Sequence, residues 1–128
     1  MQIEHLAWNV AEPVAMAAWY VEHLGMRVVR ATDAPVHARF LADAAGAVMV
    51  EIYRNEAAPI PDYAAMNPLV LHLAFASEDV DADCRRLDAA GASVVRPPYT
   101  VDGGDRLAML RDPWGVALQL VRRAELML

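Results

Sequence analysis

The sequence predicts an α+β fold built from two tandem βαβββ modules. Three pairs of similar segments carry this prediction: HLAW at residues 5–8 and HLAF at 72–75, GMRVVR at 25–30 and GASVVR at 91–96, and VMVEIYR at 48–54 and VALQLVR at 116–122. The members of these pairs are 67, 66 and 68 positions apart. Such constant spacing indicates an internal duplication with small insertions. Two copies are too few for a solenoid, so a paired, pseudo-symmetric architecture is expected.

The first module is expected to contain one helix and four strands. Alternating or β-rich segments place the strands at residues 2–8, 27–31, 37–42 and 47–54. Pro13 suits the first turn of a helix, and Gly25 suits the residue that ends it. The apolar stripe between them consists of Met16, Trp19, Tyr20 and Leu24.

The second module repeats this order. Its strands are expected at residues 69–76, 92–96, 105–111 and 116–122. Asp79 can cap the intervening helix, Gly91 can close it, and the letters DPWG at 112–115 predict a turn. The modules then cover residues 1–54 and 69–122, and a linker at 55–68 joins them.

Composition excludes several classes of protein. A chain of 128 residues with 57% hydrophobic and 22% charged residues fits one globular domain. Cys84 is the only cysteine, so no disulfide framework exists, and the amino terminus lacks the pattern of a signal peptide. A cytoplasmic protein without membrane association is expected. The net charge of −6 and the scattered arginines argue against a nucleic-acid partner and favour a small-molecule substrate.

Several of these motifs together resemble a known superfamily. The letters HLAF, a short helix ending in AAG, then VV and RDPWGVALQL are similar to the vicinal oxygen chelate superfamily. It includes glyoxalase I, bleomycin and fosfomycin resistance proteins, methylmalonyl-CoA epimerase and extradiol dioxygenases. The resemblance covers the whole chain and is strongest over residues 70–122. It implies a single glyoxalase-like domain over residues 1–128, with curved mixed sheets around a shared cavity, and a homodimer.

The resemblance also implies a metal site. Ligands in the family come from the first and last strands of each module, and these positions here are His5, Glu51, His72 and Gln119. Glu51 lies in the middle of an apolar strand, where a carboxylate needs a cation or a hydrogen-bonding partner. Two imidazoles, a carboxylate and an amide oxygen suit a divalent ion such as Zn, Ni, Co, Mn or Fe.

This site favours an enzyme of the lyase or isomerase type. A bound divalent ion polarises a carbonyl and promotes loss of a proton from the neighbouring carbon of a substrate with vicinal oxygens. Glu51 is the candidate general base, because Gln119 cannot take a proton. Arg39, Tyr53 and Arg106 are candidates for substrate binding. If the reaction inverts a stereocentre and needs a second base, Tyr53, His37 and Asp105 are the candidates for it.

Other activities of the superfamily remain open alternatives. Short bacterial glyoxalase I enzymes typically carry an arginine soon after the first histidine, where this chain has Asn9, which argues against glutathione as co-substrate. A ring-cleaving dioxygenase would use His5, His72 and Glu51, but its carboxylate usually occupies the position of Gln119. A metal-free protein of the bleomycin-resistance type would instead sequester an apolar ligand among Trp8, Tyr20, Phe40, Tyr53, Phe75 and Trp114.

Overall fold

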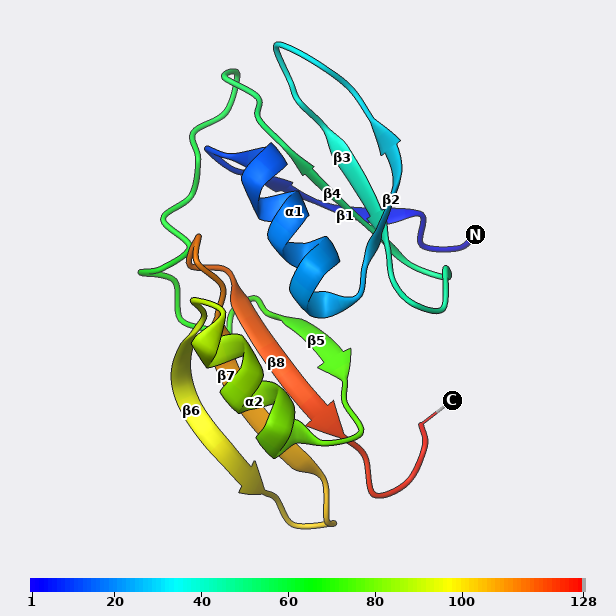
Figure 1. The fold of residues 1–128 in the computed structure, drawn as a ribbon, viewed down its shortest axis with the longest axis vertical. Helices are drawn as coiled ribbons and strands as arrows, with labels where there is room; N and C mark the ends of the chain where they lie inside the picture. Colours follow the sequence, from blue (N-terminus) through cyan, green and yellow to red (C-terminus); the bar gives the residue numbers. More distant parts are fainter. Residues whose placement is uncertain (128) are drawn as a thin grey trace. The chain divides into compact units, whose positions relative to one another are not determined.

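The computed structural model describes residues 1–127, which form two compact units that meet in sequence between Pro61 and Asp62. Each unit contains one helix and a four-stranded mixed sheet in the order βαβββ (Figure 1). This confirms the predicted fold class. The boundary falls inside the segment predicted as a linker. That the two units make one domain stays a prediction.

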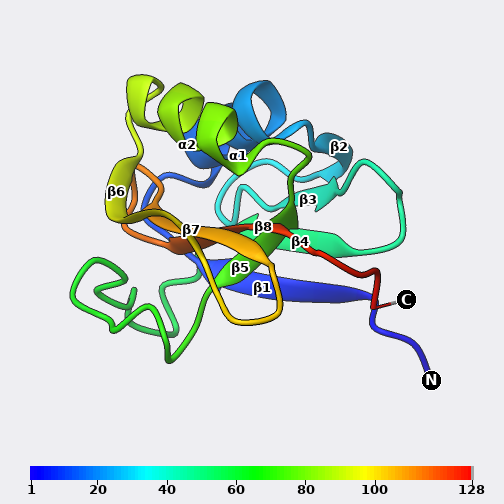
Figure 2. The ribbon, with the colours of Figure 1, turned by 90° about the horizontal axis from the view of Figure 1, so that it is seen from below.

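Unit 1 packs its helix on one face of its sheet (Figure 2). Its elements are β1 (His5–Asn9), α1 (Pro13–Leu24), β2 (Arg27–Ala31), β3 (Arg39–Ala42) and β4 (Met49–Tyr53). The strand order is β1-β4-β3-β2, with β1 parallel to β4 and the other pairs antiparallel. Met16 and Tyr20 of α1 and Leu41 and Ile52 of the sheet are fully buried, and they form the core of this unit.

The ends of α1 follow from its sequence. Pro13 occupies the first turn, where its missing N–H removes no helical hydrogen bond. Gly25 adopts a left-handed conformation with φ of 68°, and its backbone N–H donates to the carbonyl of Tyr20. A residue with a Cβ adopts this conformation only with strain, which explains why the helix ends at glycine.

Unit 2 has the same construction. Its elements are β5 (Leu73–Ala76), α2 (Val80–Ala89), β6 (Ser93–Thr100), β7 (Arg106–Arg111) and β8 (Ala117–Arg122), and the sheet order is β5-β8-β7-β6. The carboxylate of Asp79 accepts a hydrogen bond from the N–H of Ala82, which confirms the predicted cap. Val80, Cys84 and Leu87 of α2 are buried.

The predicted starts of the first strand in each unit are wrong. β1 begins at His5 rather than residue 2, because its partner β4 begins at Met49, opposite His5. β5 begins at Leu73 rather than residue 69. The side chain of Asn67 accepts a hydrogen bond from the N–H of Leu69, so this segment forms a turn instead of a strand.

A further difference from the prediction concerns strand β6. β6 continues to Thr100, beyond the predicted residue 96, through two prolines. Proline is tolerated there because β6 is an edge strand with an irregular register after Arg96.

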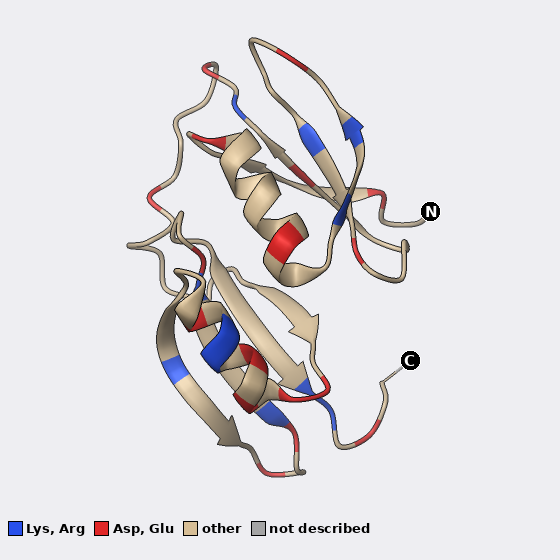
Figure 3. Ribbon diagram, in the orientation of Figure 1, with Lys and Arg blue, Asp and Glu red and all other residues tan. Residues whose placement is uncertain are grey.

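Acidic and basic residues are interspersed in both units (Figure 3). No helix within residues 1–127 is long and apolar enough to cross a bilayer.

Candidate metal centre

In unit 1, Glu51 lies on the sheet face that α1 does not cover. Along β4 the buried residues Val50 and Ile52 alternate with the partly exposed Met49, Glu51 and Tyr53. Successive side chains of a strand point to opposite faces, so Glu51 and Tyr53 share the uncovered face. The Glu51 side chain retains 19% of its exposure, which leaves the carboxylate shielded by its neighbours but accessible to a ligand.

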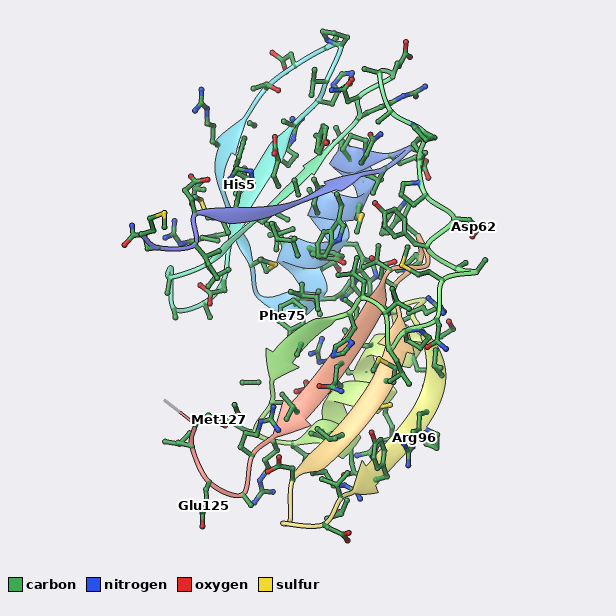
Figure 4. All side chains as sticks on the ribbon, turned by 180° about the vertical axis from the view of Figure 1, so that it is seen from behind. His5, Asp62, Phe75, Arg96, Glu125 and Met127 are labelled. Atoms are coloured by element: carbon green, nitrogen blue, oxygen red, sulfur yellow. The ribbon has the colours of Figure 1, made fainter. Side chains whose placement is uncertain are left out.

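His5 reaches Glu51 from the neighbouring strand. The register pairs Ala7 with Glu51, and His5 precedes Ala7 by two residues, so the imidazole and the carboxylate lie on the same face. Nε2 of His5 is 3.4 Å from Oε2 of Glu51. Figure 4 shows unit 1 from this side of the sheet, with His5 labelled on β1. His5 and Glu51, two of the predicted ligands, are therefore adjacent in unit 1, and their role as ligands stays a prediction.

This separation fits two donors of one metal ion. Imidazole nitrogen and carboxylate oxygen bind such ions at about 2.0–2.2 Å, which places two adjacent donors roughly 3.0–3.4 Å apart at octahedral or tetrahedral angles. When His5 is protonated, the pair forms an ion contact instead. In either case the Glu51 carboxylate has a positively charged partner, and a cation can bind Nε2 only after Nε2 loses its proton.

Two neighbours orient the His5 ring. Nδ1 of His5 forms a hydrogen bond with the Glu4 carboxylate, and the ring meets Phe40 edge to face with centroids 5.5 Å apart. The hydrogen bond to the Glu4 carboxylate is the main cause of the raised pKa of His5, opposed by desolvation and reinforced by the charges of Glu4 and Glu51. With Nδ1 committed to Glu4, Nε2 is the nitrogen that faces Glu51.

Unit 2 repeats the register at its own pair. Ala74 pairs with Gln119 as Ala7 pairs with Glu51 in unit 1, and His72 precedes Ala74 by two residues as His5 precedes Ala7. Gln119 is partly exposed between the buried Leu118 and Leu120. His72 and Gln119 thus occupy in unit 2 the positions that His5 and Glu51 occupy in unit 1.

The partner of His72 indicates which ring nitrogen is free. Nδ1 lies 2.9 Å from the carbonyl oxygen of Pro68. Because a carbonyl oxygen only accepts hydrogen bonds, Nδ1 is the donor in this contact, which leaves Nε2 for another partner. A neutral histidine with a free Nε2 is the form that binds a metal ion, and a backbone carbonyl is a common partner of its other nitrogen.

The segment before His72 is held in place by Arg111. Its guanidinium donates to the carbonyl oxygens of Tyr63, Met66 and Gly115, at 2.6–2.8 Å. Residues 62–68 are therefore tied to the β7–β8 turn and belong structurally to unit 2. Neither the adjacency of Glu4 to His5 nor the positions of Phe40, Pro68 and Arg111 in the sequence indicates these contacts, because they depend on how the strands and turns fold.

The arginines predicted to bind substrate have other partners. Arg39 pairs with Ile52, hence lies on the face opposite Glu51, and its guanidinium donates to the carbonyls of Thr32 and Ala38. Arg106 forms a bidentate ion pair with Asp81 of α2, at 2.7 and 2.9 Å. Neither arrangement contributes a guanidinium to the face that carries the candidate ligands.

The other polar candidates differ in position. Tyr53 shares the face of Glu51. Asp105 accepts hydrogen bonds from Arg123 and from the N–H of Ala124, which occupy both of its oxygens. His37 lies in the β2–β3 loop with φ of 49°, outside the strands that carry the ligands.

Asn9 has a structural role at the end of β1. Its side-chain amide donates to the carbonyls of Asn55 and Ala58 and accepts from the N–H of Asn55. These bonds fix the chain that leaves β4. Within residues 1–127, no group of three or more His, Cys, Asp or Glu side chains is placed so that it could hold a metal ion.

Comparisons with known proteins place these observations in a family. The sequence matches the Glyoxalase/Bleomycin resistance protein/Dioxygenase superfamily over residues 2–120. It is 27% identical over 127 residues to a lactoylglutathione lyase of Haemophilus influenzae, covering 94% of this chain and 92% of that protein. A probable lactoylglutathione lyase of Vibrio cholerae is 26% identical over 130 residues, covering 97% and 92% of the two chains.

A solved structure agrees with this assignment. Glyoxalase I from Zea mays superimposes with a TM-score of 0.78 at 25% identity. The match covers 97% of this chain but 45% of the Zea mays chain, so this protein spans a little under half of that length. The fold, the duplicated register and the sequence match together show that the chain belongs to the Glyoxalase/Bleomycin resistance protein/Dioxygenase superfamily.

Proposed function

We propose that this chain binds a divalent metal ion through His5, Glu51, His72 and Gln119, and acts as a lyase or isomerase on a small substrate with neighbouring oxygen atoms. The observation that carries the proposal is the 3.4 Å contact between His5 Nε2 and Glu51 Oε2 on an uncovered sheet face. The equivalent register of His72 and Gln119 supports it. The relatives named lactoylglutathione lyase support the class of activity.

The donor set suits a borderline divalent ion. Two imidazoles, a carboxylate and an amide oxygen bind Zn, Ni, Co, Mn or Fe, and the set contains no thiolate. When bound, such an ion polarises a carbonyl oxygen and stabilises the negative charge that develops as an adjacent carbon loses a proton.

Glu51 is the group that would take this proton. It is the only member of the donor set whose oxygen can be protonated, since Gln119 carries a neutral amide. Its neighbours in the sheet are Ala7 on β1 and Phe40 on β3. Tyr53 lies two residues further along the same face and is the candidate for a second proton carrier.

The two histidines present the same ring nitrogen. Glu4 occupies Nδ1 of His5, and the Pro68 carbonyl occupies Nδ1 of His72. Each imidazole therefore enters the proposed site through Nε2, with its tautomer already chosen before any ion binds. This reduces the reorganisation that metal binding requires.

The proposed substrate is not a glutathione adduct. Where the family resemblance expects an arginine that holds a glutathione carboxylate, this chain has Asn9. The Asn9 amide is engaged by Asn55 and Ala58 in unit 1. A smaller carbonyl compound is the substrate class that the remaining groups of this face support.

Metal binding tests the proposal directly. Chelator-treated protein without a His tag is titrated with Co²⁺ by calorimetry, and Glu51→Ala is compared with Glu56→Ala, which removes an equally charged but exposed carboxylate. Glu51→Ala removes the only charged side chain of the proposed donor set and should weaken Co²⁺ binding at least tenfold, which corresponds to about 1.4 kcal/mol. Glu56→Ala should bind as the wild type does. Equal affinity in all three proteins would overturn the proposal.

Proton transfer is tested separately from metal binding. Hydroxyacetone is incubated in D₂O with the Co²⁺-loaded protein, and exchange of the hydrogens next to the carbonyl is followed by NMR. Glu51→Gln should exchange at least 100-fold more slowly, because the amide cannot take a proton. An unchanged exchange rate removes Glu51 as the base. Binding of apolar ligands that chelator leaves intact, without metal binding, would favour the metal-free sequestering function instead.

A further inference from the structure

A row of paired residues crosses the uncovered face of unit 1 at Glu51. The register pairs Ala7 of β1 with Glu51, Glu51 with Phe40 of β3, and Phe40 with Arg30 of β2. Directly paired residues in a sheet project to the same face. Arg30 therefore lies on the face of Glu51, two strands away from it. Figure 3 shows the basic residues of β2 in unit 1.

A β-bulge is the reason for this placement. In the β2–β3 register, Val28 is opposite Leu41 and Arg30 is opposite Phe40, so one extra residue is accommodated between them on β2. In a regular ladder Arg30 would fall opposite Arg39, on the face that α1 covers. The bulge transfers the guanidinium to the face of the candidate metal centre.

Arg30 also differs from the other arginines near the site. It is exposed, and within residues 1–127 its guanidinium has no hydrogen bond or ion pair. Arg39 and Arg106 are engaged by loop carbonyls and by Asp81. A guanidinium that no protein group neutralises is available to an anionic ligand, with which it can form two parallel hydrogen bonds.

The repeat provides an internal comparison. In unit 2 the row runs from Gln119 to Met109 and on to Arg96, and a register shift again precedes the arginine. The guanidinium of Arg96, however, lies 3.4 Å from the centroid of the Tyr99 ring, in a cation–π contact. Arg96 is labelled on β6 in Figure 4. Arg30 of unit 1 thus differs from Arg96, whose guanidinium is engaged by Tyr99.

We infer that Arg30 selects substrates that carry a carboxylate remote from the reacting oxygens, an inference that rests on the proposed metal-dependent function. Neighbouring strands are about 4.8 Å apart, so β2 lies roughly 10 Å from β4. A ligand whose vicinal oxygens reach His5 and Glu51 can extend over Phe40 and place a second carboxylate against Arg30. The substrate class is a short 2-oxo or 2-hydroxy dicarboxylic acid.

A matched pair of ligands tests this inference. 2-Oxoglutarate and 2-oxopentanoate share the 2-oxo acid end and the chain length, and differ in the distal carboxylate. Their affinities for the Co²⁺-loaded protein are measured by calorimetry at low ionic strength, where exposed charges are least screened. The wild type should bind the dicarboxylate about tenfold more tightly, as expected for a charge-assisted contact at an exposed site.

Substitutions assign the preference to Arg30. Arg30→Gln should bind both acids equally, and Arg30→Lys should retain part of the preference, because it keeps the charge without the planar fork. Arg85→Gln, an exposed charge-matched change on α2, should bind like the wild type. Arg30→Gln should bind Co²⁺ with unchanged affinity, which shows that the variant is folded and its metal site intact.

The possible results separate the two proposals. Failure of the wild type to bind Co²⁺ overturns the proposed function and this inference with it. Metal binding with equal affinity for the two acids overturns the inference alone. A dicarboxylate preference that survives in Arg30→Gln, or disappears in Arg85→Gln, also overturns it, because the effect would then reflect net charge.

Discussion

Backbone carbonyls are the partners of several side chains in both units. His72 is oriented by the carbonyl of Pro68, and Arg111 ties the preceding segment to the β7–β8 turn through three carbonyls. In that turn the Asp112 carboxylate accepts hydrogen bonds from the N–H groups of Trp114 and Val116. The turn therefore supports both β8, which carries Gln119, and the segment that holds His72.

Gly115 is the residue of this turn that tolerates substitution least. Its φ is 90°, and a Cβ built there would lie 2.7 Å from the backbone nitrogen of Ala64. Gly115→Ala should lower the free energy of unfolding by about 2 kcal/mol or more, since strain and a backbone clash combine. Gly25→Ala is the control, because φ there is 68° but nothing lies within 4 Å. Its loss should be about 1 kcal/mol, and equal losses in urea denaturation would contradict the argument.

Among the elements, the two helices begin differently. α2 is capped by Asp79, whose carboxylate accepts from the N–H of Ala82 at 2.9 Å, and its first turn carries Asp81 and Asp83. These charges stabilise the positive end of the helix dipole. α1 has Glu12 at the capping position, where its side chain makes no capping hydrogen bond, and relies on burial of its apolar side instead.

The cap of α2 can be measured on its own. Asp79→Ala should lower the free energy of unfolding by about 1 kcal/mol, because one N–H of the first turn loses its partner. Asp79→Asn keeps the acceptor oxygen and should retain most of that stability. Thermal and urea unfolding monitored by circular dichroism compare the variants. A similar loss in both would show that charge, rather than the hydrogen bond, is what Asp79 contributes.

At the scale of the molecule, two repeats with the same register present unequal chemistry. Each unit has its own buried core, centred on Leu41 in unit 1 and on Leu118 in unit 2. Unit 1 offers an imidazole and a carboxylate, whereas unit 2 offers an imidazole and a neutral amide. The duplication therefore preserves the positions of the two pairs, but only the pair of unit 1 has a carboxylate, that of Glu51.

The stability of the whole protein should fall in acid. The hydrogen bond from Arg106 lowers the pKa of Asp81, and hydrogen bonds from the Ala124 N–H and from Arg123 lower the pKa of Asp105. Because these folded-state pKa values lie below the unfolded value of about 3.9, their stabilisation is complete above that pH and is lost as pH falls through the folded values.

Urea midpoints measured between pH 3 and pH 6 check this expectation. The wild type should lose stability below about pH 4, and Arg106→Gln should show a shallower loss, since Asp81 then titrates near its ordinary pKa. An equally steep loss in the variant would show that other carboxylates dominate the acid unfolding.

The local elements were accessible to sequence reasoning, whereas the partners of the candidate site residues were not. Pro13, Gly25 and Asp79 mark helix ends by their own conformational preferences, and these signals were correct. Arg39 and Arg106 were selected as cations near the site, yet the register puts Arg39 on the covered face and Asp81 engages Arg106. Partners distant in sequence leave no local signal.

The sequence by itself determined the duplicated βαβββ order, the ends of the helices and the alternation that separates Glu51 from the core, because these depend on residues close together in the chain. Only the tertiary structure decided the start of β5 after the Asn67 turn, the partners of each histidine and the bulge that turns Arg30 to the face of Glu51. Such features depend on pairing between segments far apart in sequence, where one inserted residue moves a side chain to the other face of the sheet.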